Sequence, residues 1–296
     1  RLGIFGWFEG YKQLNISRNL GLIDQQNALR WIQHNIAAFG GDPTRVTLQG
    51  QSEGAGIILA HLVSPGSAGL FHRAIFHSPP ADMWSRKANL ERTAFMVKRV
   101  GCYRKRPEIM LRCLKRKNAQ ELWSMDWVSE ELSRHPLSRR WTLNLLGLLG
   151  FARSKGNFSD MPFYLGWHAV VDGDTLPGEP RELIAQGKWS KVPVLMTVSK
   201  NESYGVFPGA SNPSTATMPI ELGLNALTKS GDLPRLKDRY RQTLLQSGIN
   251  VSDLQLLHQM LTDKMWTCDV RSLARDIMQG GGKAHVGMFW HSPKFD

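Results

Sequence analysis

The feature that most constrains the fold of this chain is a short strand that runs directly into a serine turn and then into an apolar helix. Residues 46–48 have the composition of a strand, the turn reads Gly50-Gln51-Ser52-Glu53-Gly54, and residues 55–63 are nearly all apolar. Such a turn lifts the serine hydroxyl above a sheet, beside the amide groups and positive dipole end of the helix. The pattern predicts a nucleophilic Ser52, with Gly50 and Gly54 both needed to avoid side-chain clashes. The alternative, a serine that only caps the helix, leaves both glycines unexplained.

The rest of the chain alternates between strand-like and helix-like segments. The expected strands are the end of one at residues 1–5 and others at 46–48, 74–76, 192–198 and 286–290. An amphipathic helix is expected at 22–39, with one face formed by Ala28, Trp31, Ile32, Asn35 and Ile36. This alternation predicts an α/β fold with a mostly parallel central sheet. Residues 119–160 are basic and helix-like, break the rhythm, and are expected to form an insertion above the sheet.

Composition and charge exclude several classes of protein. The chain has 296 residues, of which 42% are hydrophobic, so it can bury a large core. Its longest apolar stretch, 143–152, is too short to cross a bilayer, and we expect no transmembrane segment. A net charge of +12 would suit a polyanion. Because the basic segments lack interleaved aromatics and match no nucleic-acid motif, we expect a solvated basic surface and no nucleic-acid partner.

The three cysteines carry information about compartment. Cys102 and Cys113 lie eleven residues apart, and Cys268 stands alone. No histidines lie at ligand spacing, so we expect no structural metal and are left with a disulfide or two free thiols. Four glycosylation sequons, more than chance predicts, favour an exported protein. They begin at Asn15, Asn157, Asn201 and Asn250.

Long segments of the sequence resemble the type-B carboxylesterase and cholinesterase family of α/β-hydrolases. The resemblance is carried by residues 19–26, 35–43, 46–54, 69–75 and 171–177, and weakens between 118 and 160. It implies the α/β-hydrolase fold, with helices on both faces of the sheet, and a serine ester hydrolase that needs no cofactor. It also implies a small-molecule ester substrate, a secreted or ER-lumenal location and a possible homodimer through parts not present. Residues 1–296 would then be one partial α/β-hydrolase domain.

The same resemblance assigns catalytic roles. Ser52 would be the nucleophile, Glu202 the acid that orients a histidine, and the Glu53 backbone N–H an oxyanion donor. Glu202 follows a predicted buried strand, and the alternative for it is a surface loop carboxylate. We expect the catalytic histidine beyond Asp296 and the glycine-rich oxyanion loop before Arg1. The 296-residue chain is therefore expected to turn over little or not at all, and a fragment that cannot fold alone is a further alternative.

Supporting roles follow from the resemblance as well, and each has an alternative as an ordinary core or surface group. They are a salt bridge of Arg1 with Asp24, a disulfide of Cys102 with Cys113, a pair formed by Ser78 and Asp263 beside the histidine, and an acyl pocket lined by Phe163 and Leu165. Cys268 matches a cysteine whose partner lies nearer the family's C-terminus.

The sequence departs from the common family pattern beside the nucleophile. Gln51 replaces an acidic residue, and Glu53 replaces an alanine. A carboxylate at Glu53 would oppose a developing negative charge unless it points into solvent. A glycan on Asn201 would lie beside the acid, so we expect that sequon to be unused. The competing function is a non-catalytic, cholinesterase-like adhesion ectodomain, because this fold also serves binding.

Overall fold

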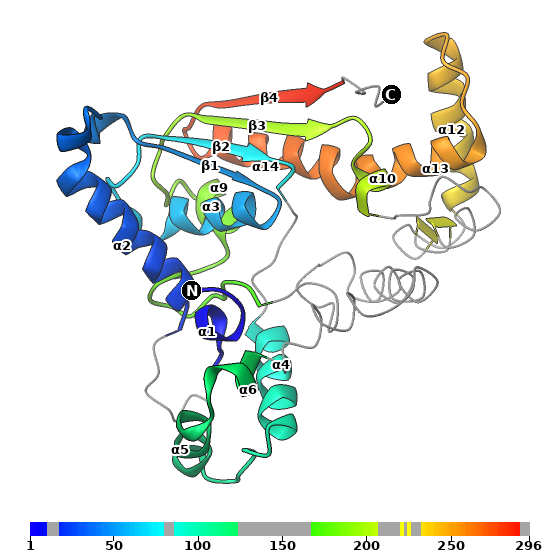
Figure 1. Ribbon diagram of the computed structural model, residues 1–296. Coiled ribbons are helices and arrows are strands. Elements are labelled where there is room, and N and C mark those ends of the chain that lie inside the picture. The colour runs from blue at the N-terminus through cyan, green and yellow to red at the C-terminus, as the bar shows by residue number, and fades with distance from the viewer. Residues whose placement is uncertain are drawn as a thin grey trace, which may run out of the picture.

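The structure is a computed structural model that describes residues 1–10, 18–79, 86–123, 167–206, 220–221, 224–225 and 232–290. Its centre is a parallel sheet of four strands in the order β1-β2-β3-β4 (Figure 1). The strands are β1 (Thr47–Gln51), β2 (Arg73–His77), β3 (Val194–Ser199) and β4 (Ala284–Phe289). The predicted mixed α/β architecture with a parallel sheet is confirmed for the described residues.

Helical segments connect the strands, as parallel neighbours require. The helices are α1 (Gly3–Trp7), α2 (Leu20–Asn35), α3 (Glu53–Val63), α4 (Arg86–Arg99), α5 (Pro107–Arg116), α6 (Ala119–Trp123), α9 (Pro180–Ala185), α10 (Glu202–Val206), α12 (Asp232–Gln246), α13 (Asp253–Thr262) and α14 (Cys268–Gln279). None of the described helices is long and apolar enough to span a bilayer.

The main core lies between the sheet and the helices α3, α9 and α14, which Figure 1 shows on one side of it. Residues 55–63 of α3 are all buried, which explains the apolar run after the serine turn. In β3, Val194, Met196 and Val198 point into this core, while Leu195 is 40% exposed on the other face. Burial of such a side chain stabilises the fold by roughly 1.5–3 kcal/mol. Helices on the second face of the sheet remain a prediction.

The expected strand at residues 1–5 is wrong, because residues 3–7 form the helix α1. Ile4 and Trp7 lie three residues apart, so a helix places both on one buried face. A Cβ atom on Gly21 of α2 would lie 2.5 Å from the Trp7 ring. The close packing of α1 on α2 therefore favours a helix at residues 3–7. This segment is too short for its sequence to show a helical period.

The expected apolar face of the second helix is also wrong. Trp31 is 53% exposed, and the buried positions of α2 include Leu22, Gln26 and Leu29. Gln26 is buried because its side-chain amide donates to the hydroxyls of Ser64 and Ser67, at 2.8 and 3.1 Å. The helix ends at Asn35, and a 3-10 turn covers Ile36–Phe39.

A second, smaller core lies under α4 and α5. It contains Met96, Val97, Met110 and Leu114, and the disulfide of Cys102 with Cys113 closes it. These helices and α6 lie away from the sheet in Figure 1. Only the start of the expected insertion, α6, falls in the described residues, so the insertion itself remains a prediction.

Candidate active site

The serine turn joins β1 to α3 in a strained conformation. Ser52 has φ 54° and ψ −122°, a region that residues with a side chain rarely occupy. Its N–H donates to the His77 carbonyl of β2 at 2.9 Å, which ties the turn to the neighbouring strand. The Ser52 side chain is exposed and makes no capping hydrogen bond. A purely capping role for this serine therefore has no contact to support it.

The two glycines of the turn differ. A Cβ atom on Gly50 would lie 2.3 Å from the Gly54 carbonyl oxygen, so this position excludes any side chain. A Cβ atom on Gly54 would meet nothing within 4 Å. The expectation that both glycines avoid a clash is thus right for Gly50 and wrong for Gly54, which lies in the first turn of α3 and faces open space.

The first turn of α3 offers amide donors next to Ser52. The N–H groups of Ala55 and Gly56 donate to the Ser52 carbonyl at 2.9 and 3.0 Å. Those of Glu53 and Gly54 precede them and have no acceptor within the helix, as is general for the first residues of helices. The helix dipole adds a partial positive charge at the same place. The turn can therefore stabilise an anion that forms beside Ser52 Oγ.

The Glu53 side chain modifies that electrostatic environment. Its carboxyl keeps access to solvent, yet surrounding protein atoms desolvate it and raise its pKa to about 7. The Arg92 guanidinium opposes this rise. Glu53 is consequently neutral in mildly acidic solution and becomes an anion above about pH 7.

Glu202 is the first residue of α10 and follows β3 by three positions. Its Oε1 atom accepts from the Ser199 N–H at 2.6 Å and from the Ser78 hydroxyl. Ser78 follows β2 and has a positive φ of 47°, so a second strained residue serves this contact. Among the described residues, both donors to Glu202 use Oε1, which leaves Oε2 able to accept another hydrogen bond. Such a half-buried, anchored carboxylate is unlike a solvated loop residue.

A buried polar cluster fixes the residue after Glu202. The Ser203 hydroxyl lies 2.7 Å from His258 Nδ1 and 3.0 Å from the His258 carbonyl oxygen. The Thr262 hydroxyl donates to Ser203 Oγ at 3.2 Å, and the Tyr204 ring stacks on His258. Sequence reasoning missed this cluster because its two halves, at residues 203–204 and 258–262, are more than 50 residues apart in the chain, and no local pattern signals the contact.

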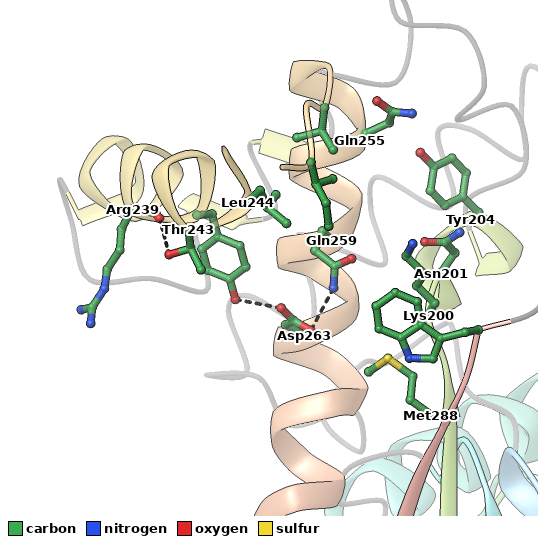
Figure 2. Close-up of a pocket in the computed structure, with 14 residues that line it drawn as sticks. Lys200, Asn201, Tyr204, Arg239, Thr243, Leu244, Gln255, Gln259, Asp263 and Met288 are labelled. Atoms are coloured by element: carbon green, nitrogen blue, oxygen red, sulfur yellow. Dashed lines mark hydrogen bonds between the residues drawn. The ribbon is translucent and has the colours of Figure 1, made fainter. Parts of the chain in front are cut away.

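Asp263 lies in a cavity of about 500 Å³ between α12, α13 and the ends of β3 and β4 (Figure 2). Its carboxylate accepts from the Tyr240 hydroxyl and from the Gln259 amide, both at 3.1 Å. Burial, with Asp263 nearby, raises the pKa of the Tyr240 phenol. Ser78 donates to Glu202 instead, so the structure does not join Ser78 and Asp263 by a hydrogen bond.

The other predicted pairs are close in space. The Arg1 guanidinium donates to both carboxylate oxygens of Asp24 at 2.9 Å and holds the pKa of Asp24 at about 2. Cys102 and Cys113 form the disulfide that the resemblance implies, while Cys268 is a free, exposed thiol.

Other predictions concern the acyl pocket and the sequons. Phe163 and Leu165 lie outside the described residues, as do Asn15 and Asn157. Asn201 and Asn250 are exposed. Use of the Asn201 sequon remains a prediction.

No described histidine hydrogen-bonds to Ser52 or Glu202. His61 is buried in α3 against Ser67 and Gln25, and His77 contacts Thr197 and Gln49. Within the described ranges, no three metal-ligating side chains are gathered in one place. The site thus presents a strained, exposed serine, amide donors and an anchored carboxylate.

Comparison with known proteins identifies one family and a distant relative. The sequence profile of the Carboxylesterase family matches residues 1–296. The acetylcholinesterase of Bungarus fasciatus is 29% identical over 307 residues, covering 98% of this chain and 46% of that protein. The chain therefore spans about half the length of this curated relative.

Proposed function

Because the chain belongs to the carboxylesterase family, we propose that the protein is a serine ester hydrolase with Ser52 as nucleophile and Glu202 as the orienting acid. The observation that carries the proposal is that a strained, exposed Ser52 follows β1 and an anchored Glu202 carboxylate follows β3, at the same carboxyl edge of the parallel sheet. Strain that surrounding structure maintains is typical of functional sites.

In the proposed reaction, Ser52 Oγ attacks the ester carbonyl carbon while a histidine takes the hydroxyl proton. The tetrahedral intermediate then expels the alcohol, which receives that proton, and leaves an acyl group on Ser52. Water attacks the acyl-enzyme by the same route and releases the carboxylic acid. Glu202 Oε2 accepts a hydrogen bond from the imidazole and stabilises its charged form without taking its proton.

The oxyanion is proposed to lie at the first turn of α3, against the Glu53 N–H. We propose that the histidine and a glycine-rich loop with further oxyanion donors are supplied from outside residues 1–296. One missing oxyanion donor costs about 10² to 10³ in rate. Loss of a triad histidine costs roughly 10⁶. Residues 1–296 alone should therefore show almost no turnover.

A small-molecule ester is the proposed substrate, and the reaction uses no cofactor. The disulfide and the exposed sequons support a location in the secretory pathway or outside the cell. The acyl-pocket role of Phe163 and Leu165 is part of the same proposal, and it rests on the resemblance alone.

A fluorophosphonate probe tests the proposal on the full-length protein. We expect stoichiometric covalent labelling that Ser52→Ala abolishes, whereas Ser247→Ala, at an exposed serine just after the end of α12, leaves it unchanged. Full labelling of the folded Ser52→Ala variant, or no labelling of the folded wild type, would overturn the hydrolase assignment and favour the non-catalytic ectodomain.

A further inference from the structure

The positive charge of this protein is concentrated in one small part of the fold. Residues 98–117 contain nine Lys or Arg residues and one Glu, a net charge of +8 in a chain whose total is +12. They comprise the end of α4, the connecting loop and α5, and the Cys102–Cys113 disulfide closes this hairpin. We refer to residues 98–117 as the basic lobe.

Most charges of the basic lobe face solvent and have no carboxylate partner among the described residues. Eight of the nine are exposed, namely Lys98, Arg99, Arg104, Lys105, Arg106, Arg112, Lys115 and Arg116. Within the described residues, none of these eight forms a salt bridge, and Lys117 alone pairs, with Glu121 at 3.0 Å. Charges of one sign held this close repel one another, so the folded lobe gains from an anion that binds it.

The exposed cations follow α5 from end to end. Arg104, Lys105 and Arg106 precede its first residue, and Lys115 and Arg116 lie in its last turn. At 1.5 Å per residue, the ten-residue helix separates these two groups by roughly 15 Å. Figure 1 shows α5 at the end of the described structure away from the sheet, and hence away from the end of β1, which Ser52 follows. The basic lobe thus presents a row of exposed positive charges along α5, apart from the candidate active site.

We propose that the basic lobe binds a linear sulfated polysaccharide. Guanidinium groups match the planar oxygen pairs of sulfate as they match those of phosphate, and a linear polyanion can contact both ends of α5 at once. The disulfide points to an oxidising compartment, which favours an extracellular polyanion over a nucleic acid.

A bilayer fits the basic lobe less well than a linear polyanion does. Its one aromatic residue, Tyr103, carries the Lys98 ammonium over its ring, 5.5 Å from the ring centre. Because of that contact, the ring face that could otherwise enter lipid is covered by a charged group. The lobe therefore favours binding through charge along a chain.

Heparin, titrated against the full-length protein at about 0.15 M salt, tests the proposal. We expect the triple variant R104Q/K105Q/R106Q to bind heparin about tenfold more weakly or worse, and R112Q/R116Q to weaken binding as well. The matched control K188Q/R235Q/K283Q removes three exposed charges elsewhere and should change the affinity less than twofold. Fluorophosphonate labelling and thermal melting confirm that each variant is folded.

Three outcomes would overturn the proposal. Equal weakening by the lobe and control triples would mean that total charge alone attracts heparin. Unchanged binding by both lobe variants would place the contact elsewhere. Tighter binding to phosphatidylserine vesicles or to RNA than to heparin, lost in the lobe variants, would assign the surface to a different partner.

Discussion

At the scale of single residues, the candidate site holds two carboxyl groups in different environments. Glu202 is anchored by the Ser199 amide and the Ser78 hydroxyl, both on Oε1. Glu53 has no such donor among the residues that the structure describes, and desolvation raises its pKa to about 7. Its charge therefore changes near neutral pH, one residue from the proposed nucleophile Ser52.

The rate of fluorophosphonate labelling should report that charge. Above pH 7 the Glu53 anion opposes the developing oxyanion, so Glu53→Gln should label faster than wild type by about fivefold, from roughly 1 kcal/mol of repulsion. Below pH 6 the two rates should converge, because Glu53 is then neutral. Glu182→Gln, at an exposed carboxylate of α9, serves as control. Parallel profiles from pH 6 to 9 would show that Glu53 has no such effect.

The two glycines of the serine turn make a second test. Gly50→Ala forces a contact with the Gly54 carbonyl and should reduce labelling at least tenfold and lower the free energy of unfolding by about 2–4 kcal/mol. Gly54→Ala meets open space and should keep labelling within about threefold. Labelling rates and urea unfolding should be measured for both variants. An equal loss of labelling rate and stability in the two would contradict the difference in space around Gly50 and Gly54.

Much of the candidate site could be predicted because its signals are local. Ser52 and Gly50 lie in one strand-turn-helix pattern. Glu202 was assigned through the family resemblance, and its place just after a buried strand agrees with that assignment. The contact between Ser203 and His258 was not predicted, because it depends on how α10 packs on α13. The steric freedom of Gly54 likewise depends on the space around α3, which no sequence pattern encodes.

At the scale of elements, strands with strong apolar runs were predicted well, and amphipathic surfaces less so. The buried face of α2 includes Gln26, a polar residue whose hydrogen bonds to Ser64 and Ser67 compensate its burial. Hydrophobicity alone cannot identify such a position. The helix α1 was missed because five residues are too few to distinguish a helical period from a strand.

Burial of His61 within α3 gives the fold a pH dependence. Desolvation lowers the pKa of His61 to about 4, below its unfolded value near 6.5. The unfolded state therefore binds the proton more readily, and stability is lost as pH falls from 6.5 to 4, by on the order of 3 kcal/mol. Urea unfolding of the full-length protein at pH 7.5 and 4.5 should show this loss, and His61→Gln should reduce it. The control is His34→Gln, at an exposed histidine, which should keep the full loss of stability between pH 7.5 and 4.5. If His61→Gln also keeps the full loss, then groups other than His61 cause the pH dependence.

At the scale of the whole molecule, the described chain divides its apolar residues between a main core under the sheet and a second core in the α4–α5 hairpin. The parallel sheet was predictable from the alternation of elements. The grouping of these basic runs on one projecting hairpin was not predictable, because the sequence shows the runs without showing how they are arranged in space.

The disulfide should stabilise the hairpin more than the sheet. Its cysteines are eleven residues apart, for which loss of the cross-link costs roughly 3 kcal/mol. In C102S/C113S we expect faster amide hydrogen exchange in residues 96–117 and unchanged protection in β1 to β3. Equal acceleration in the sheet would mean that the hairpin and the main core unfold as one unit.

The central claim is that Ser52 and Glu202 Oε2 flank the place of an imidazole. A crystal structure of the full-length protein after reaction with a fluorophosphonate measures this directly. We predict phosphorus bonded to Ser52 Oγ, a phosphonyl oxygen within hydrogen-bond distance of the Glu53 N–H, and a histidine N–H donating to Glu202 Oε2. An adduct on a different serine, or a Glu202 Oε2 in contact only with solvent, would contradict it.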